Sequence, residues 1–230
     1  MIRHIAFIPA RKGSKGFPGK NSKFFKHTAD FLFKNKLFNK VIVSTNDPKV
    51  QKKALKYNFE IHHRPINVSR SNSSIKSTIQ CMVSDMSLNK TDIIWLFYIP
   101  VTYKNIKDFE NAKKIMKNNK VRSILSFIKS DIHPYNFWRY NRKSKKLSQY
   151  IKNDISRRQD LPEALRYYHY ICCFRVSELT KLNSELINSR TYPIILDNNT
   201  SEELIEIDTP KDYIKWKIHR DSKKTKYKKF

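Results

Sequence analysis

The sequence predicts an α/β fold: a three-layer, Rossmann-like domain built on a mostly parallel sheet. Three observations favour it. Strand-like apolar runs alternate with segments of helical periodicity. All three glycines lie in one loop directly after the first apolar run. The 230 residues, 39% of them hydrophobic, suffice for one sheet with covering helices. We expect a single domain over residues 1–219, with an insertion at residues 130–165 and a basic, flexible tail at residues 220–230.

The elements follow in order from the spacing of apolar residues. Residues 93–98 are apolar nearly throughout and predict a central strand, whereas residues 75, 79, 82 and 86 have helical spacing. Residues 130–165 are polar, carry several aromatic side chains and lose this rhythm. The predicted strands are residues 2–8, 40–44, 59–63, 93–98, 123–128, 167–174 and 203–207. The predicted helices are residues 24–37, 48–57, 73–86, 106–117 and 210–219.

The glycine loop, residues 8–21, is the chemically richest stretch of the chain. Gly13, Gly16 and Gly19 allow positive φ angles or close backbone approach. Its cations and backbone N–H groups, placed at the end of a first strand, suit a polyphosphate. It is not a Walker A loop, because five residues separate Gly13 from Gly19 and Asn21 follows Lys20. It also has no Gly-x-Gly dinucleotide fingerprint.

The run Pro9-Ala10-Arg11-x-Gly13-Ser14-Lys15-Gly16-x-Pro18-x-Lys20-Asn21 resembles the signature of the nucleotide-sugar cytidylyltransferases. It is most similar to that of the CMP-N-acetylneuraminate (sialic acid) synthetases, with the CMP-Kdo synthetases further off. The resemblance implies a nucleotidyltransferase fold with a small dimerisation arm at residues 130–165. It also implies a homodimeric enzyme that joins CTP and a nine-carbon 2-keto sugar acid, giving a CMP-sugar and pyrophosphate.

On this resemblance, the nucleotide would bind to the loop and to a later polar segment. Arg11 and Lys15 would hold the triphosphate and stabilise the departing pyrophosphate, and Asn21 would lie near the base. Arg64 and the serines would meet cytosine and ribose, although Ser73 and Ser74 also suit a helix N-cap. The nucleotide-binding residues implied are Ala10, Arg11, Gly13, Ser14, Lys15, Lys20, Asn21, Arg64, Asn72, Ser73 and Ser74.

The sugar side of the resemblance is altered. Arg158, Gln159 and Arg166 match residues that approach the sugar acid in relatives, often from the partner subunit. An arginine fork suits a carboxylate, but arginines on a polar insertion can equally be surface residues. Residues 98–104 stand where the family has Gln-Pro-Thr-Ser-Pro-Leu-Arg, and Lys104 takes the place of the arginine. Residues 166–170 stand where the family has Arg-Pro-Asn-Gly-Ala. The acceptor is therefore less defined than the nucleotide.

Glu206 and Asp208 resemble the late acidic pair of the family. Alternation along the strand expected at residues 203–207 would put both carboxylates on one face. Such oxygens are hard ligands for Mg²⁺, the expected cofactor, and Asp208 is the third expected catalytic residue with Arg11 and Lys15. A cap on the helix expected at Pro210 is the alternative role for Asp208.

Net charge, cysteine content and the lack of a long apolar segment limit the possible partners and the cellular compartment. The net charge of +27 attracts anions, but its lysines are scattered, so we interpret it as composition rather than a nucleic-acid footprint. Three cysteines give a poor disulfide framework, and neither a signal peptide nor a membrane span is apparent, which favours the cytoplasm. Cys172 and Cys173 suit the core. His62, His63 and His133 lack a cysteine or carboxylate at ligand spacing, so structural roles are expected.

Two other functions stay open at this stage. One is an enzyme of the same fold that uses another nonulosonic acid, Kdo or another nucleotide. The other is a degenerate, non-catalytic relative that binds nucleotide or nucleic acid. The altered sugar-side segments and the large positive charge favour the second somewhat.

Overall fold

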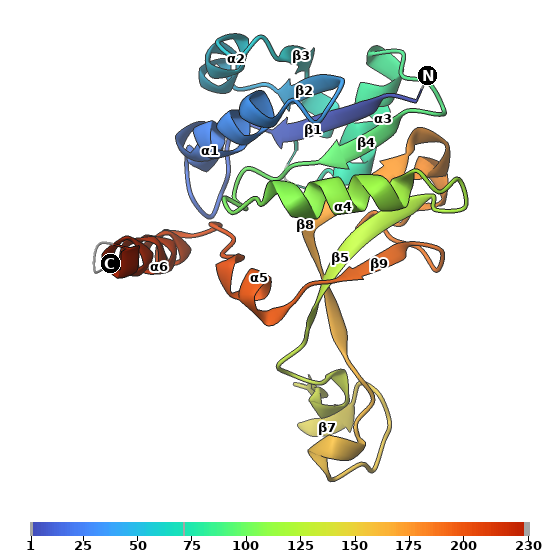
Figure 1. Cartoon of the computed structure of the whole chain (residues 1–230). Coiled ribbons are helices and arrows are strands. Elements are labelled where there is room, and N and C mark those ends of the chain that lie inside the picture. The colour runs from blue at the N-terminus through green and yellow to red at the C-terminus, as the bar shows by residue number, and fades with distance from the viewer. Residues whose placement is uncertain (1, 71, 228–230) are drawn as a thin grey trace.

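The computed structural model describes residues 2–70 and 72–227, and its centre is a seven-stranded sheet (Figure 1). The strand order is β3-β2-β1-β4-β8-β5-β9. Neighbouring strands are parallel except at β8, which runs antiparallel to both β4 and β5. The predicted α/β fold with a mostly parallel sheet is confirmed. The strands are β1 (His4–Ala10), β2 (Lys40–Thr45), β3 (Glu60–His63), β4 (Ile93–Leu96), β5 (Ser123–Lys129), β8 (Leu165–Arg175) and β9 (Tyr192–Ile195).

Helices cover both faces of the sheet, which explains why the central strand β4 is apolar and buried throughout. In β1, Ala6 and Ile8 join the core beneath α1, α2, α4 and α6, whereas Ile5 and Phe7 join the core beneath α3. The sheet is therefore the middle one of three layers. The helices are α1 (Lys20–Asn35), α2 (Pro48–Leu55), α3 (Ile75–Asp85), α4 (Ile106–Met116), α5 (Asn198–Glu203) and α6 (Pro210–Tyr227). Of the helices described, none combines the length and apolar character that a membrane crossing requires.

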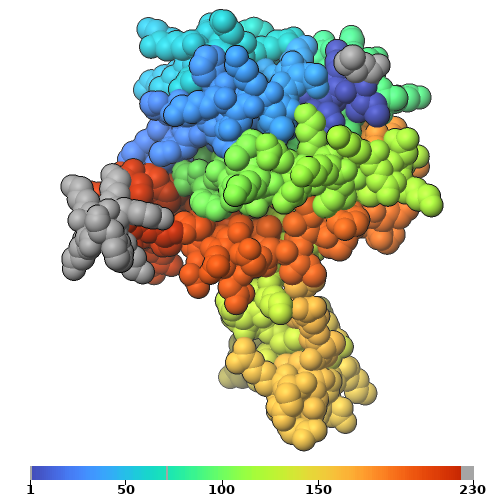
Figure 2. Space-filling model, in the orientation of Figure 1, coloured from blue at the N-terminus to red at the C-terminus, as the bar shows by residue number. Residues whose placement is uncertain are grey.

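Residues 130–165 leave the body as a projecting arm, the yellow segment at the bottom of Figures 1 and 2. Its hairpin of β6 (Trp138–Asn141) and β7 (Lys146–Gln149) pairs only with itself. Both strands are largely exposed, so this segment has no share in the two cores of the body.

The late part of the chain differs from the prediction. The strand expected at residues 203–207 is wrong: α5 extends to Glu203, and only an isolated bridge joins Glu206 to Val101. Asp197 caps α5 by accepting from the Thr200 N–H at 2.6 Å, which commits this segment to a helix. The edge strand β9 was not predicted, because it is short and interrupted by Pro193. Of the tail expected to be loose, residues 220–227 continue α6, and residues 228–230 lie outside the described residues.

Candidate active site

The glycine loop lies at the edge of the sheet where the parallel strands β1, β2 and β4 end. β1 ends at Ala10 and α1 begins at Lys20, so residues 11–19 connect them across this edge (Figure 1). Gly13 and Gly19 have φ angles of 79° and 72°, a left-handed conformation that favours glycine. Open parallel sheets bind their ligands at this edge, beyond the carboxyl ends of the strands.

Three contacts fix the loop in place. The backbone N–H of Lys12 donates to the Asn46 side chain at 2.7 Å, which ties the loop to the turn after β2. The Asn21 amide donates to the Arg11 carbonyl at 3.0 Å. Phe17 packs against Tyr213 of α6, with ring centroids 6.0 Å apart. The loop is therefore held from β2, α1 and α6, and Asn21 has a positioning role within it.

Gly16 brings the loop into contact with the acidic segment from the far end of the sequence. A Cβ atom at Gly16 would lie 2.7 Å from the backbone oxygen of Asp208, closer than real side chains allow. Beside this contact, the Lys20 ammonium forms an ion pair with the Asp208 carboxylate. Asp208, expected to act together with residues of the loop, therefore lies against the loop in the structure.

Gly16→Ala is expected to destabilise the protein by about 1–3 kcal/mol, because the added methyl forces the Asp208 backbone away. Urea unfolding measures the loss, and amide exchange locates it at Ile207, whose N–H donates to the Pro100 carbonyl at 3.2 Å. Gly13→Ala is the matched control, since its Cβ would meet no atom within 4 Å. In this control only the strain of the positive φ at residue 13 lowers stability, and the Ile207 amide should stay protected from exchange. Unchanged stability and exchange in Gly16→Ala would contradict this close packing.

A pocket of about 240 Å³ opens beside the loop and is strongly basic. Arg64 is 7% exposed and donates to the Val68 carbonyl from Nε and Nη2, at 2.9 and 2.5 Å. Burial, followed by repulsion from Arg11, lowers the pKa of Arg64 to about 10. An anion in the pocket would relieve this crowding of cations. The pocket is lined by Pro9, Arg11, Ser14, Lys20, Asn21, Arg64, Ser73, Ile75, Tyr98 and Pro100.

The predicted nucleotide residues divide between the pocket and its surroundings. Six of them line it: Arg11, Ser14, Lys20, Asn21, Arg64 and Ser73. Lys15, Gly13 and Asn72 are exposed outside the lining, and Ala10 is buried at the end of β1. Ser74 is the N-cap of α3 and accepts from the Ser77 N–H at 3.0 Å, which is the alternative role expected for it.

The acidic segment lies beside the pocket, although not on the strand that was predicted. The Ile207 hydrogen bond to Pro100 and the Val101–Glu206 bridge hold it against the chain that follows β4. Partial burial, followed by the neighbouring Asp208 carboxylate, raises the pKa of Glu206. Thr209 is the N-cap of α6, because its Oγ1 accepts from the Asp212 N–H at 3.3 Å, and the Asp212 carboxylate accepts in return from the Thr209 N–H at 2.8 Å. The capping role considered for Asp208 therefore belongs to Thr209 and Asp212. The Asp208 carboxylate is thus left to face Lys20.

The predicted sugar-binding residues are not gathered at this pocket within one chain. The Lys104 ammonium donates to the Val101 carbonyl, and burial lowers its pKa to about 7. Arg158 and Gln159 lie in a short turn of the arm. Arg166 lines a separate hollow at the base of the arm, with its guanidinium 5.9 Å from the Tyr168 ring centroid.

Sequence reasoning missed two groups of residues. Tyr98 and Ile75 line the pocket, one just beyond the central strand β4 and the other in the first turn of α3. The expectation that His62 has no cysteine or carboxylate partner is wrong, because Cys81 and Asp85 lie beside it. These partners come from α3, and separation in the sequence concealed them.

Comparisons with known proteins find similarity to cytidylyltransferases. Residues 5–98 match the family model described as "Cytidylyltransferase". The chain is 25% identical over 222 residues to an N-acylneuraminate cytidylyltransferase of Streptococcus agalactiae serotype III, strain NEM316. That match covers 93% of the chain but 52% of the relative, so the chain spans about half the length of the curated relatives it matches.

Solved structures show the same fold at low sequence identity. A CMP:2-keto-3-deoxy-manno-octonic acid synthetase complexed with CTP superimposes with a TM-score of 0.66 and 15% identity, over 96% of this chain and 99% of that one. A 4-diphosphocytidyl-2C-methyl-D-erythritol synthase from Anaerococcus prevotii gives a TM-score of 0.57 at 10% identity, over 96% and 99% of the two chains. The chain is therefore similar to cytidylyltransferases in part of its sequence and in its fold, as its glycine loop predicted.

Proposed function

We propose that the protein transfers a cytidylyl group from CTP to a 2-keto sugar acid of the sialic acid type, giving the CMP-sugar and pyrophosphate. The observation that carries the proposal is the basic pocket at the glycine loop, with Asp208 packed against Gly16. The similarity to N-acylneuraminate cytidylyltransferases supports the choice of substrates. We also propose a cytoplasmic location, supported by three free cysteines.

In the proposed reaction, the C2 hydroxyl oxygen of the sugar acid attacks the α-phosphorus of CTP. A new P–O bond forms, the bond to the β-phosphate oxygen breaks, and pyrophosphate leaves with the electron pair while the hydroxyl proton is lost. Phosphoryl-type transfers depend mainly on positioning and charge neutralisation. Arg11 and Lys15 hold the triphosphate and neutralise the leaving group. Arg64 and Ser73 position the nucleoside, and Asn21 keeps the loop in shape.

The residues at the loop suit Mg²⁺. Asp208 offers a carboxylate whose side chain is 54% exposed, and the Lys20 ammonium already lies on it as a stand-in cation. Glu206 offers a second carboxylate nearby, with a longer reach. Hard oxygen ligands of this kind, completed by substrate phosphates and water, are what Mg²⁺ prefers. When bound, the ion would neutralise phosphate charge and polarise the attacking hydroxyl.

We propose a homodimer in which the arm meets the partner subunit. The arm has several exposed apolar side chains on a segment that adds nothing to the cores of the body. They are Phe137, Trp138, Tyr140, Leu147, Tyr150 and Ile151. The sugar-side residues Arg158 and Gln159 are on the arm, away from the pocket of their own chain. A partner's arm can deliver them to the pocket, which would complete the sugar site.

A screen of pyrophosphate release tests the proposal. Purified protein is incubated with Mg²⁺, with CTP, UTP or GTP, and with a set of sialic, other nonulosonic and Kdo acids. We expect release only with CTP, fastest with a nine-carbon acid. Release with another nucleotide, or with Kdo as the only acceptor, would show that the enzyme uses that substrate instead of the one proposed. CTP binding without release would identify a non-catalytic relative. Light scattering of the same sample gives the mass, where a value of one chain contradicts the homodimer.

A further inference from the structure

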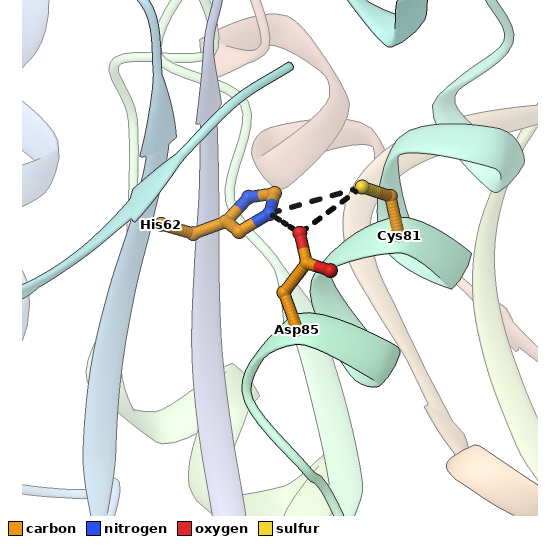
Figure 3. Close-up of side chains that lie close together, drawn as sticks. All are labelled: His62, Cys81 and Asp85. Atoms are coloured by element: carbon orange, nitrogen blue, oxygen red, sulfur yellow. Dashed lines mark hydrogen bonds and ion pairs between the residues drawn. The ribbon is translucent and has the colours of Figure 1, made fainter.

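Three metal-ligating side chains converge on the side of the sheet covered by α3, apart from the acidic segment of the proposed active site. His62 is on β3, and Cys81 and Asp85 are one turn apart on α3 (Figure 3). Their ligand atoms all lie within 4.8 Å of one another. Residues at i and i+4 share one face of a helix, so α3 presents both its thiol and its carboxylate to the imidazole.

The spacing of the three atoms is close to that of a tetrahedral metal site. His62 Nε2 and Asp85 Oδ2 are 3.0 Å apart, Cys81 Sγ and Asp85 Oδ2 3.2 Å, and Cys81 Sγ and His62 Nε2 4.0 Å. Bond lengths of about 2.0 Å to nitrogen or oxygen and about 2.3 Å to sulfur give tetrahedral separations of about 3.3 and 3.5 Å. Each observed separation is therefore within about 0.5 Å of the tetrahedral one. Rotation of the exposed Asp85 side chain can adjust its two distances, and a small rotation of the half-buried Cys81 side chain would close the remaining gap to His62.

The histidine is already oriented as a ligand. Its other nitrogen, Nδ1, lies 2.8 Å from the Oγ of Ser44, which is fully buried on β2. With a proton on Nδ1 donated to that oxygen, the lone pair of Nε2 points at the thiol and the carboxylate. Metal-binding histidines are typically held by such a hydrogen bond from the nitrogen that does not bind the metal.

A catalytic Cys–His pair fits the same residues less well. The thiol donates to Asp85 rather than to His62, and burial, followed by that hydrogen bond, raises the pKa of Cys81. A nucleophilic cysteine needs the opposite shift. A metal ion would instead replace the thiol proton, and all three ligand atoms could coordinate it at the point where they converge.

We propose that His62, Cys81 and Asp85 bind a divalent transition-metal ion of the Zn²⁺ type, with a fourth, open position for water or an external ligand. One nitrogen, one thiolate and one carboxylate are a ligand set for zinc rather than for magnesium. The ion would fasten β3 to α3. Both elements lead to the pocket, through Arg64 after β3 and Ile75 at the start of α3. The site would thus stabilise the nucleoside side of the pocket and take no part in the transfer itself.

Titration with Co²⁺ tests this site without any substrate. In the purified full chain we expect one equivalent to give a thiolate-to-cobalt charge-transfer band, which Zn²⁺ then abolishes by displacement. Cys81→Ser should remove the band, and Asp85→Asn and Ser44→Ala should each weaken the apparent affinity at least about tenfold. Cys172 and Cys173 are buried, so a band that survives Cys81→Ser would overturn the assignment.

His63→Gln is the matched control, because His63 is the exposed neighbour of His62 on the same strand. Its band and affinity should equal those of the parent protein, whereas His62→Gln should lose both. Zn²⁺ should raise Tm in the parent and in His63→Gln but not in Cys81→Ser, with chelator-treated samples as the reference for folding. The absence of a stoichiometric band in the folded parent protein would refute the site, whether or not CTP is turned over.

Discussion

Asp208→Asn is expected to lower kcat for pyrophosphate release by about a hundredfold or more, and to raise the Mg²⁺ concentration needed for half of the remaining rate. The substitution removes the carboxylate charge that would hold the ion, and metal ions contribute several kcal/mol to this type of transition state. Initial rates across a range of Mg²⁺ concentrations measure both effects. A kcat within about threefold of the parent value would contradict the assignment of Asp208 to the metal.

The fold should tolerate this change. The Lys20–Asp208 pair is partly exposed, and pairs of that kind contribute at most about 1 kcal/mol to stability. Asp212→Asn is a matched control, because it removes a negative charge close to the same place. Asparagine can still accept from the Thr209 N–H, so the α6 cap and the activity should both survive. A similar loss of activity in both variants would indicate a general charge effect instead.

The glycine loop shows what could be predicted from sequence. Its glycines, its cations and its place after an apolar strand are all local features, and they predicted the fold, the similarity to cytidylyltransferases and one wall of the pocket. The wall formed by Tyr98 and Pro100 was not predicted, because residues 98–104 were assigned to the sugar side of the resemblance rather than to the nucleotide pocket. The role of this wall arises only where β4 lies beside β1 in the sheet.

The acidic segment shows where such reasoning fails. Glu206 and Asp208 were placed correctly near the loop but on a strand that does not form, since alternation over five residues is a weak signal beside the Asp197 cap. The His62, Cys81 and Asp85 cluster could not be predicted at all. Its ligands come from β3 and α3, and only the packing of that helix on the sheet brings them together.

Arg11→Ala is expected to lower kcat by about 10²–10³-fold, with a smaller change in KM for CTP, because removal of one charge-stabilising donor costs about that much. The guanidinium lines the pocket at the end of β1, and its donation to the Gly13 carbonyl at 3.1 Å keeps it at the loop. A group that acts mainly on the departing pyrophosphate affects kcat more than substrate binding. Steady-state kinetics with saturating sugar acid separate the two parameters.

Lys12→Ala is the control for Arg11→Ala. Lys12 is the next cation along the loop, its side chain is exposed, and its anchoring bond to Asn46 comes from the backbone, which the substitution leaves intact. Its rate should stay within about threefold of the parent rate. Arg11→Lys keeps the charge but loses the planar fork, so an intermediate rate is expected. Equal losses in Lys12→Ala and Arg11→Ala would mean that the loop acts only through its total charge, and the specific role given to Arg11 would then be wrong.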